Sequence, residues 1–167
     1  MEILKTAFVI LALLSLHELG HVISAKLIGV RIVKVGFSFA PLPHPYVVVE
    51  NLDFFYQRLI YLLAGIAMTV LLLIIFKLSG LIYYSFIFYA FAIEILLETN
   101  PFYSDLTLLA LPIHQHRQLS EGISRGKISG MGLIYANSYI FSSIWYLHLI
   151  LWSVLIYLLF AEKILII

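Results

Sequence analysis

The stretch Leu13–Ala25, LLSLHELGHVISA, decides how this chain folds, because it sets three ionisable side chains inside an apolar run. The run extends from Ile3 to Ile28, which at ~1.5 Å per helical residue is long enough to cross a bilayer with some tilt. A charged group at the centre of a bilayer costs at least ~2.5–3.5 kcal/mol, so such groups usually have a function. The stretch therefore predicts a membrane helix that carries a site. A signal peptide is the alternative, but no A-x-A-like cleavage site follows.

The composition of the whole chain agrees with a membrane location. Of its 167 residues, 63% are hydrophobic and 11% are charged, whereas soluble domains are about 45–50% apolar and about 25% charged. We expect an integral membrane protein formed by a single domain, residues 1–167, with the lipid bilayer as its surroundings. The net charge of +1 and the lack of a basic tract give no sign of nucleic-acid binding. The absence of cysteine excludes thiol catalysis, disulfides and thiolate metal sites.

Further apolar runs of about 20 residues or more indicate additional membrane spans. They cover Phe55–Phe76, Leu81–Glu98 and Met131–Phe160. The third run stops at Asn100-Pro101, where a short helical piece follows, so we predict a broken helix there. The expected fold is an all-α polytopic membrane protein with about four transmembrane helices. Its core would be residues 3–111, with residues 131–160 as an accessory C-terminal helix.

The segment after Gly29 has a different character. It is β-branched and alternating from Val30 to Val49, with a proline-rich turn at Pro41–Pro45. This pattern predicts a short β-hairpin at the membrane face.

The distribution of basic residues predicts an orientation, since lysine and arginine favour the cytoplasmic side. Three basic residues lie on one side of the predicted spans: Lys5, Lys77 and Lys163. Seven lie on the other: Lys26, Arg31, Lys34, Arg58, Arg117, Arg125 and Lys127. We therefore expect the hairpin and the loop His114–Gly130 in the cytoplasm, both termini outside, and the HELGH site near the cytoplasmic side.

HELGH itself matches the HExxH pattern of zinc peptidases. His17 and His21 are four residues apart and share one helix face, and Glu18 lies beside them. Two imidazoles can bind Zn²⁺, while the glutamate takes a proton from the water that the metal activates. We expect one Zn²⁺ per chain and Glu18 as the catalytic residue. The alternative is a polar cluster satisfied by hydrogen bonds between helices.

A catalytic zinc site needs a third protein ligand. Asp105 follows the predicted helix break, which could turn its carboxylate inward, and Glu94, His114 and His116 are the other candidates. The two histidines lie in the polar loop and are more typical of loop residues.

Two other acidic or amide positions leave alternatives open. Glu94 either lines the site or pairs with a hydroxyl, and Asn100 either binds substrate or braces the helix break. Glu98, one turn after Glu94, is interpreted as an interface residue.

Several motifs, in order, resemble those of the site-2 protease family of intramembrane zinc metalloproteases. They are HELGH, then AKLIGVRIVKVGFSF, LAGIAMTV and NPFYSD, within residues 5–111. The chain differs from the family pattern at Thr69, where asparagine is usual, and at Leu106, where glycine is usual. The resemblance implies that His17, His21 and Asp105 are the zinc ligands and Glu18 the catalytic acid and base.

The function expected from this resemblance is hydrolysis of peptide bonds within or near the membrane. The substrate would be a transmembrane or membrane-associated protein or peptide, whose identity the sequence leaves open, as it does the oligomeric state. A catalytically inactive relative that acts as a membrane-protein binder or chaperone is the alternative. A membrane diiron oxidase is a third class, but six scattered histidines do not supply its repeated ligand boxes.

Overall fold

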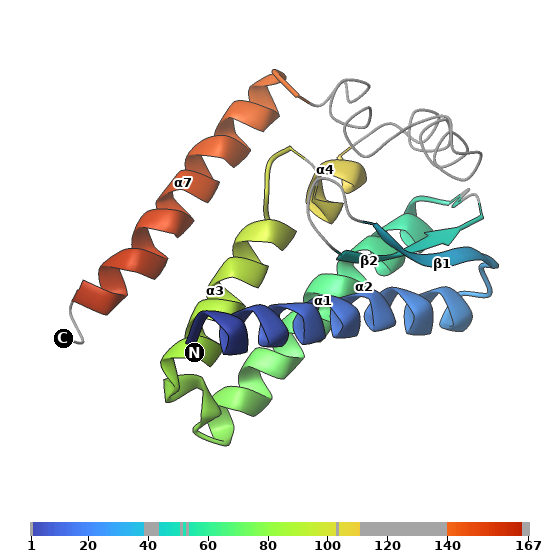
Figure 1. Cartoon of the computed structure of the whole chain (residues 1–167). Helices are drawn as coiled ribbons and strands as arrows, with labels where there is room; N and C mark the ends of the chain where they lie inside the picture. Colours follow the sequence, from blue (N-terminus) through green and yellow to red (C-terminus); the bar gives the residue numbers. More distant parts are fainter. Residues whose placement is uncertain are drawn as a thin grey trace.

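The computed structural model describes residues 2–38, 44–50, 52, 54–102, 104–110 and 140–164. In these ranges the chain is mainly helical and carries one two-stranded antiparallel sheet (Figure 1). The elements in chain order are α1 (Glu2–Leu27), β1 (Ile32–Ser38), β2 (His44–Val49), α2 (Phe55–Leu78), the 3₁₀ helix η1 (Leu81–Tyr83), α3 (Ser85–Glu98), α4 (Asp105–Leu109) and α7 (Ser143–Ile164).

Helix α1 confirms the first predicted helix almost to the residue. It ends where Gly29 adopts a left-handed conformation with φ +70°, which glycine tolerates without steric cost. The N–H of Val30 then donates to the carbonyl oxygen of Ala25 at 2.9 Å, and Lys26 lies in the last turn near the negative end of the helix dipole. This ending turns the chain directly into the hairpin.

The predicted β-hairpin is also confirmed. Strands β1 and β2 pair in antiparallel register, with Val35 opposite Val47 and Ser38 opposite His44. Strand β2 begins at His44, so the expected turn at Pro41–Pro45 is wrong at its C-terminal end, while residues 39–43 lie outside the described residues. The hairpin lies beside the C-terminal half of α1 (Figure 1).

In the described part of the chain, two helices, α1 and α2, are long and apolar enough to cross a membrane. Helix α2 begins at Phe55 as predicted and ends at Leu78, followed by Gly80 with φ +75°. Only 22% of the most apolar window of each helix is buried inside the protein, which suits helices that contact lipid.

The third predicted span is wrong as a single helix. The chain forms η1 and then α3, which has 14 residues, because Tyr84 between them is extended with φ −71° and ψ 125°. At ~1.5 Å per residue α3 extends ~21 Å, less than the ~30 Å of a hydrocarbon core.

The last predicted span is partly wrong as well. Helix α7 begins at Ser143, twelve residues later than predicted, and residues 140–142 form a turn. The remainder of the expected helix, residues 131–139, lies outside the described part of the chain. Helix α7 therefore enters from a turn rather than continuing a long helix.

Helix α7 is fixed to the end of α3 by three ring nitrogens on one face. The last carbonyl groups of a helix have no partner inside it, so they accept hydrogen bonds from other groups. The pairs are Trp145 Nε1 with Pro101 O at 2.9 Å, His148 Nε2 with Thr99 O at 2.9 Å, and Trp152 Nε1 with Leu96 O at 3.0 Å. These bonds hold the chain on both sides of the break that leads to α4.

Candidate metal centre

The two histidines of HELGH face the interior from adjacent turns of α1. His17 is 7% exposed and His21 is 3% exposed, and their Nε2 atoms lie 3.1 Å apart. The Nδ1 atom of His21 donates to the backbone carbonyl of Tyr61 at 2.8 Å. A hydrogen bond at Nδ1 leaves Nε2 with the lone pair that a metal needs.

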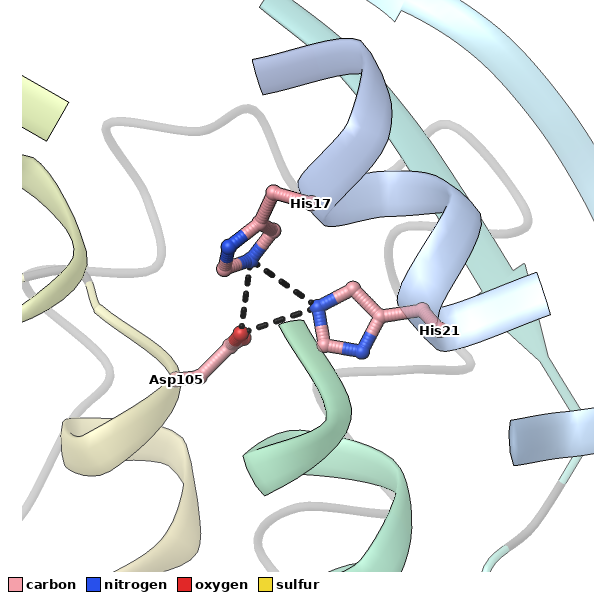
Figure 2. A group of neighbouring side chains, drawn as sticks. All are labelled: His17, His21 and Asp105. Carbon is pink, nitrogen blue, oxygen red and sulfur yellow. Dashed lines mark hydrogen bonds and ion pairs between the residues drawn. The ribbon is translucent and has the colours of Figure 1, made fainter. Parts of the chain in front are cut away.

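Asp105 completes a triangle of ligand atoms with these histidines. Its Oδ2 atom lies 3.2 Å from His17 Nε2 and 3.0 Å from His21 Nε2 (Figure 2). Burial by itself raises the pKa of the Asp105 carboxyl. Hydrogen bonds from the two imidazoles and their positive charges lower it by more, so this pKa lies below its ordinary value. The side chain keeps 19% of its surface exposed, so the triangle is not sealed from the outside.

The break before α4 is what turns Asp105 inward. Asn100 is buried, and its Oδ1 atom accepts a hydrogen bond from the N–H of Phe102 at 2.8 Å. Pro101 lacks an N–H and disfavours helical continuation, and Thr99 Oγ1 caps the carbonyl of Ile95 at 2.6 Å. The geometry of Asn100 therefore fits bracing of the break, one of its two predicted roles.

The three donors fit a small metal ion. Tetrahedral ligands at ~2.0–2.1 Å from Zn²⁺ lie roughly 3.4 Å apart, close to the 3.0–3.2 Å between these atoms. Two imidazole nitrogens and one carboxylate oxygen also form a donor set that catalytic zinc sites use. His17, His21 and Asp105 form a group able to hold a metal, as does the set His17, Glu94 and Glu98.

A missing side chain on α2 keeps this space open. A Cβ atom at Gly65 would overlap His17 Nε2 and would lie 2.7 Å from His21 Nε2. Gly20, within HELGH, faces α2 in the same way, because a Cβ there would lie 2.6 Å from the carbonyl oxygen of Ala64. Two glycines thus allow α1 and α2 to approach closely at the level of the triangle.

Glu18 lies on α1 next to His17 and outside the ligand triangle. Its side chain is partly buried, and Val47 of β2 lies near its carboxylate. The imidazoles of His17 and His21 are close enough to interact with its charge. Helix α1 thus carries a carboxylate beside, but not among, the three ligand atoms.

The acidic residues of α3 lie on the other side of His17. Glu94 is fully buried, and its carboxylate oxygens have no hydrogen-bond partner in the described ranges. The interpretation of Glu98 as an interface residue is wrong, since it is 8% exposed and its Oε1 atom lies 2.5 Å from His17 Nδ1. Thr69 of α2, which the sequence analysis noted only as a departure from the family motif, donates to the same oxygen. The i, i+4 spacing of the two glutamates shows a shared face but not which helix it meets.

Of the rival third ligands, His114 and His116 lie outside the described residues.

Comparison of the chain with protein families, curated proteins and solved structures finds no match. The functional argument therefore depends on the geometry of the site and on the motifs.

Proposed function

We propose that the chain is an intramembrane zinc metalloprotease, an HExxH metalloendopeptidase that cleaves peptide bonds within or near the membrane. The observation that carries this proposal is the convergence of His17 Nε2, His21 Nε2 and Asp105 Oδ2 to within 3.0–3.2 Å of one another, with Glu18 alongside. The two ligand histidines lie in a helix long and apolar enough to span a bilayer. A polar group of this kind in such a helix supports a catalytic role.

Each residue has a separate task in the proposed reaction. A zinc ion held by His17, His21 and Asp105 would supply Lewis acidity toward a peptide carbonyl and a water molecule. Glu18 accepts the proton of the attacking water and later delivers it to the nitrogen of the leaving amine. This role requires a carboxylate near the ligands that does not itself bind the metal, which agrees with the position of Glu18 outside the group His17, His21 and Asp105.

The membrane arrangement completes the proposal. We propose four spans from the four apolar runs, with η1 and α3 together forming the third. The hairpin lies in the cytoplasm and both termini lie outside, as the distribution of basic residues predicts. His21 is six residues before the end of α1, ~9 Å along the helix axis, so water would need to enter only a short way. The substrate is a transmembrane or membrane-associated protein or peptide that unwinds locally, because helical hydrogen bonds otherwise cover its peptide bonds.

The substitution Glu18→Gln tests this function. Glutamine keeps the size of the side chain but cannot take a proton, so we expect zinc content to stay near one ion per chain and cleavage to fall by about 100-fold or more. Zinc is measured by elemental analysis of the purified protein. Cleavage is measured by mass spectrometry of membrane peptides that accumulate in cells carrying the variant.

Glu2→Gln is the matched control, since Glu2 lies in the same helix, is exposed and pairs with Lys5. It should leave both zinc content and the peptide profile unchanged. A Glu18→Gln protein that processes membrane peptides at the wild-type rate would exclude the proposed proton transfer. Zinc binding without any Glu18-dependent cleavage would favour the non-catalytic binder or chaperone.

A further inference from the structure

Both nitrogen atoms of the His17 ring have defined partners, on the side of the ligand triangle and on the side away from it. Its Nε2 atom faces His21 and Asp105, whereas its Nδ1 atom lies 2.5 Å from Glu98 Oε1. The hydroxyl of Thr69 donates to the same Oε1 atom, so this oxygen acts as an acceptor and the proton of its contact with His17 belongs to Nδ1. This assignment leaves the lone pair of Nε2 directed at the site.

Glu98 is itself held in place by a second helix. The hydroxyl of Thr69 donates to Glu98 Oε1, the oxygen that also contacts His17. Thr69 is 1% exposed and lies one turn after Gly65 on α2, and its β-branched side chain has few rotamers available. His17, Thr69 and Glu98 therefore join α1, α2 and α3 in one hydrogen-bonded chain.

The two histidines differ in what their Nδ1 atoms contact. His21 Nδ1 bonds a neutral backbone carbonyl of Tyr61, whereas His17 Nδ1 bonds a carboxylate. A carboxylate raises the basicity of a ligand imidazole and fixes its orientation.

We propose that Glu98, oriented by Thr69, is a positioning residue that fixes the His17 imidazole for metal binding. This proposal depends on the proposed zinc function, because it assigns a role toward the same ion. Glu98 does not take part in the ligand triangle and need not touch the substrate. Its effect reaches the metal only through His17.

Metal affinity tests this role without any measurement of cleavage. Zinc dissociation constants of the purified full chain in detergent are measured by competition with a chromophoric chelator, and Co²⁺ loading reports ligand geometry through its visible absorption. We expect Glu98→Gln to weaken zinc binding by about 10- to 100-fold and to change the Co²⁺ spectrum, as is typical of residues that orient a ligand. Thr69→Val, which replaces the hydroxyl with a methyl group, should weaken binding about threefold.

Thr6→Val is the matched control for Thr69→Val. It is the same substitution in a helix of the site, but the Thr6 hydroxyl donates to the carbonyl of Glu2 near the start of α1 and not to the chain that leads to His17. It should keep wild-type zinc affinity, and if Glu98→Gln does not fold, the two threonine variants decide the question. Wild-type affinity and spectrum in folded Glu98→Gln, or equal affinities of the two threonine variants, would overturn the positioning role. A wild-type chain that binds neither Zn²⁺ nor Co²⁺ would overturn both proposals.

Discussion

The crossing of α1 with α2 and the contact of α3 with α7 join helices in opposite ways. At the crossing, Gly20 and Gly65 bring the helices together because they lack side chains. At the α3–α7 contact, Trp145, His148 and Trp152 reach across with long side chains that hydrogen-bond carbonyl groups near the break. The first region sets the space around the two histidines, and the second supports the backbone that carries Asp105. At the crossing, the addition of a side chain should therefore weaken the site. At α7, the loss of a side-chain hydrogen bond should weaken it.

The largest effect is expected at Asp105, where the two regions meet. Asp105→Ala removes one of three ligand atoms, so we expect zinc affinity to fall by more than about 100-fold, since changes outside the ligand set alone cost about 10- to 100-fold. Zinc titration of the purified variant measures this loss. His114→Ala and His116→Ala should keep wild-type affinity. Full zinc occupancy in Asp105→Ala, with loss in either histidine variant, would move the third ligand into the loop.

The next effect tests whether the crossing depends on absent side chains. Gly65→Ala places a methyl group against His17 and His21, and overpacking of this kind costs about 1–3 kcal/mol. Because the methyl group displaces the imidazole nitrogens from their positions, we expect zinc affinity to fall by about 10- to 100-fold. Binding is again measured by competition with a chelator.

Gly80→Ala provides the comparison for Gly65→Ala. Gly80 has a left-handed φ of +75° and no atom within 4 Å of an added Cβ, so its replacement costs about 1–2 kcal/mol of stability through the backbone alone. We expect a lower unfolding temperature and unchanged zinc affinity. Equal zinc affinities of the two variants would show that space at the crossing does not limit the site.

The smallest effect is expected at α7. Trp145→Phe keeps an aromatic ring beside Phe102 but removes the N–H that donates to Pro101 O, which should lower the free energy of unfolding by about 0.5–1.5 kcal/mol. Because Pro101 lies in the break, zinc affinity should also fall about threefold. Trp152→Phe removes the same kind of bond, but to Leu96 O, which lies in α3 before the break. This variant should have lower stability and unchanged zinc affinity. An equal loss of zinc affinity in both variants would assign α7 a general rather than a local effect.

The sequence by itself determined the parts of the molecule that depend on local patterns. An unbroken apolar run bounded by Gly29 predicted α1, and the next run predicted α2, because helix length and left-handed glycine ends are local properties. Alternation of β-branched residues predicted the hairpin. Spacing of four residues put His17 and His21 on one face, and the helix break marked Asp105 as the third member of the group that the structure brings together.

The third and fourth apolar runs show the limit of such patterns. Hydropathy does not detect the extended backbone at Tyr84, so one helix was predicted where the chain forms η1 and α3. It does not detect the turn at 140–142 either, so a longer helix was predicted than α7.

Only the tertiary structure decided how residues distant in the sequence meet. The contact of His17 with Glu98, 81 residues away, and that of Thr69 with the same carboxylate depend on the packing of three helices. The face of a helix can be read from its own sequence, but the neighbour that the face meets is set by the crossing of other helices. Glycine at position 65 shows the same dependence, since its lack of a side chain acquires meaning only against the two imidazoles of α1.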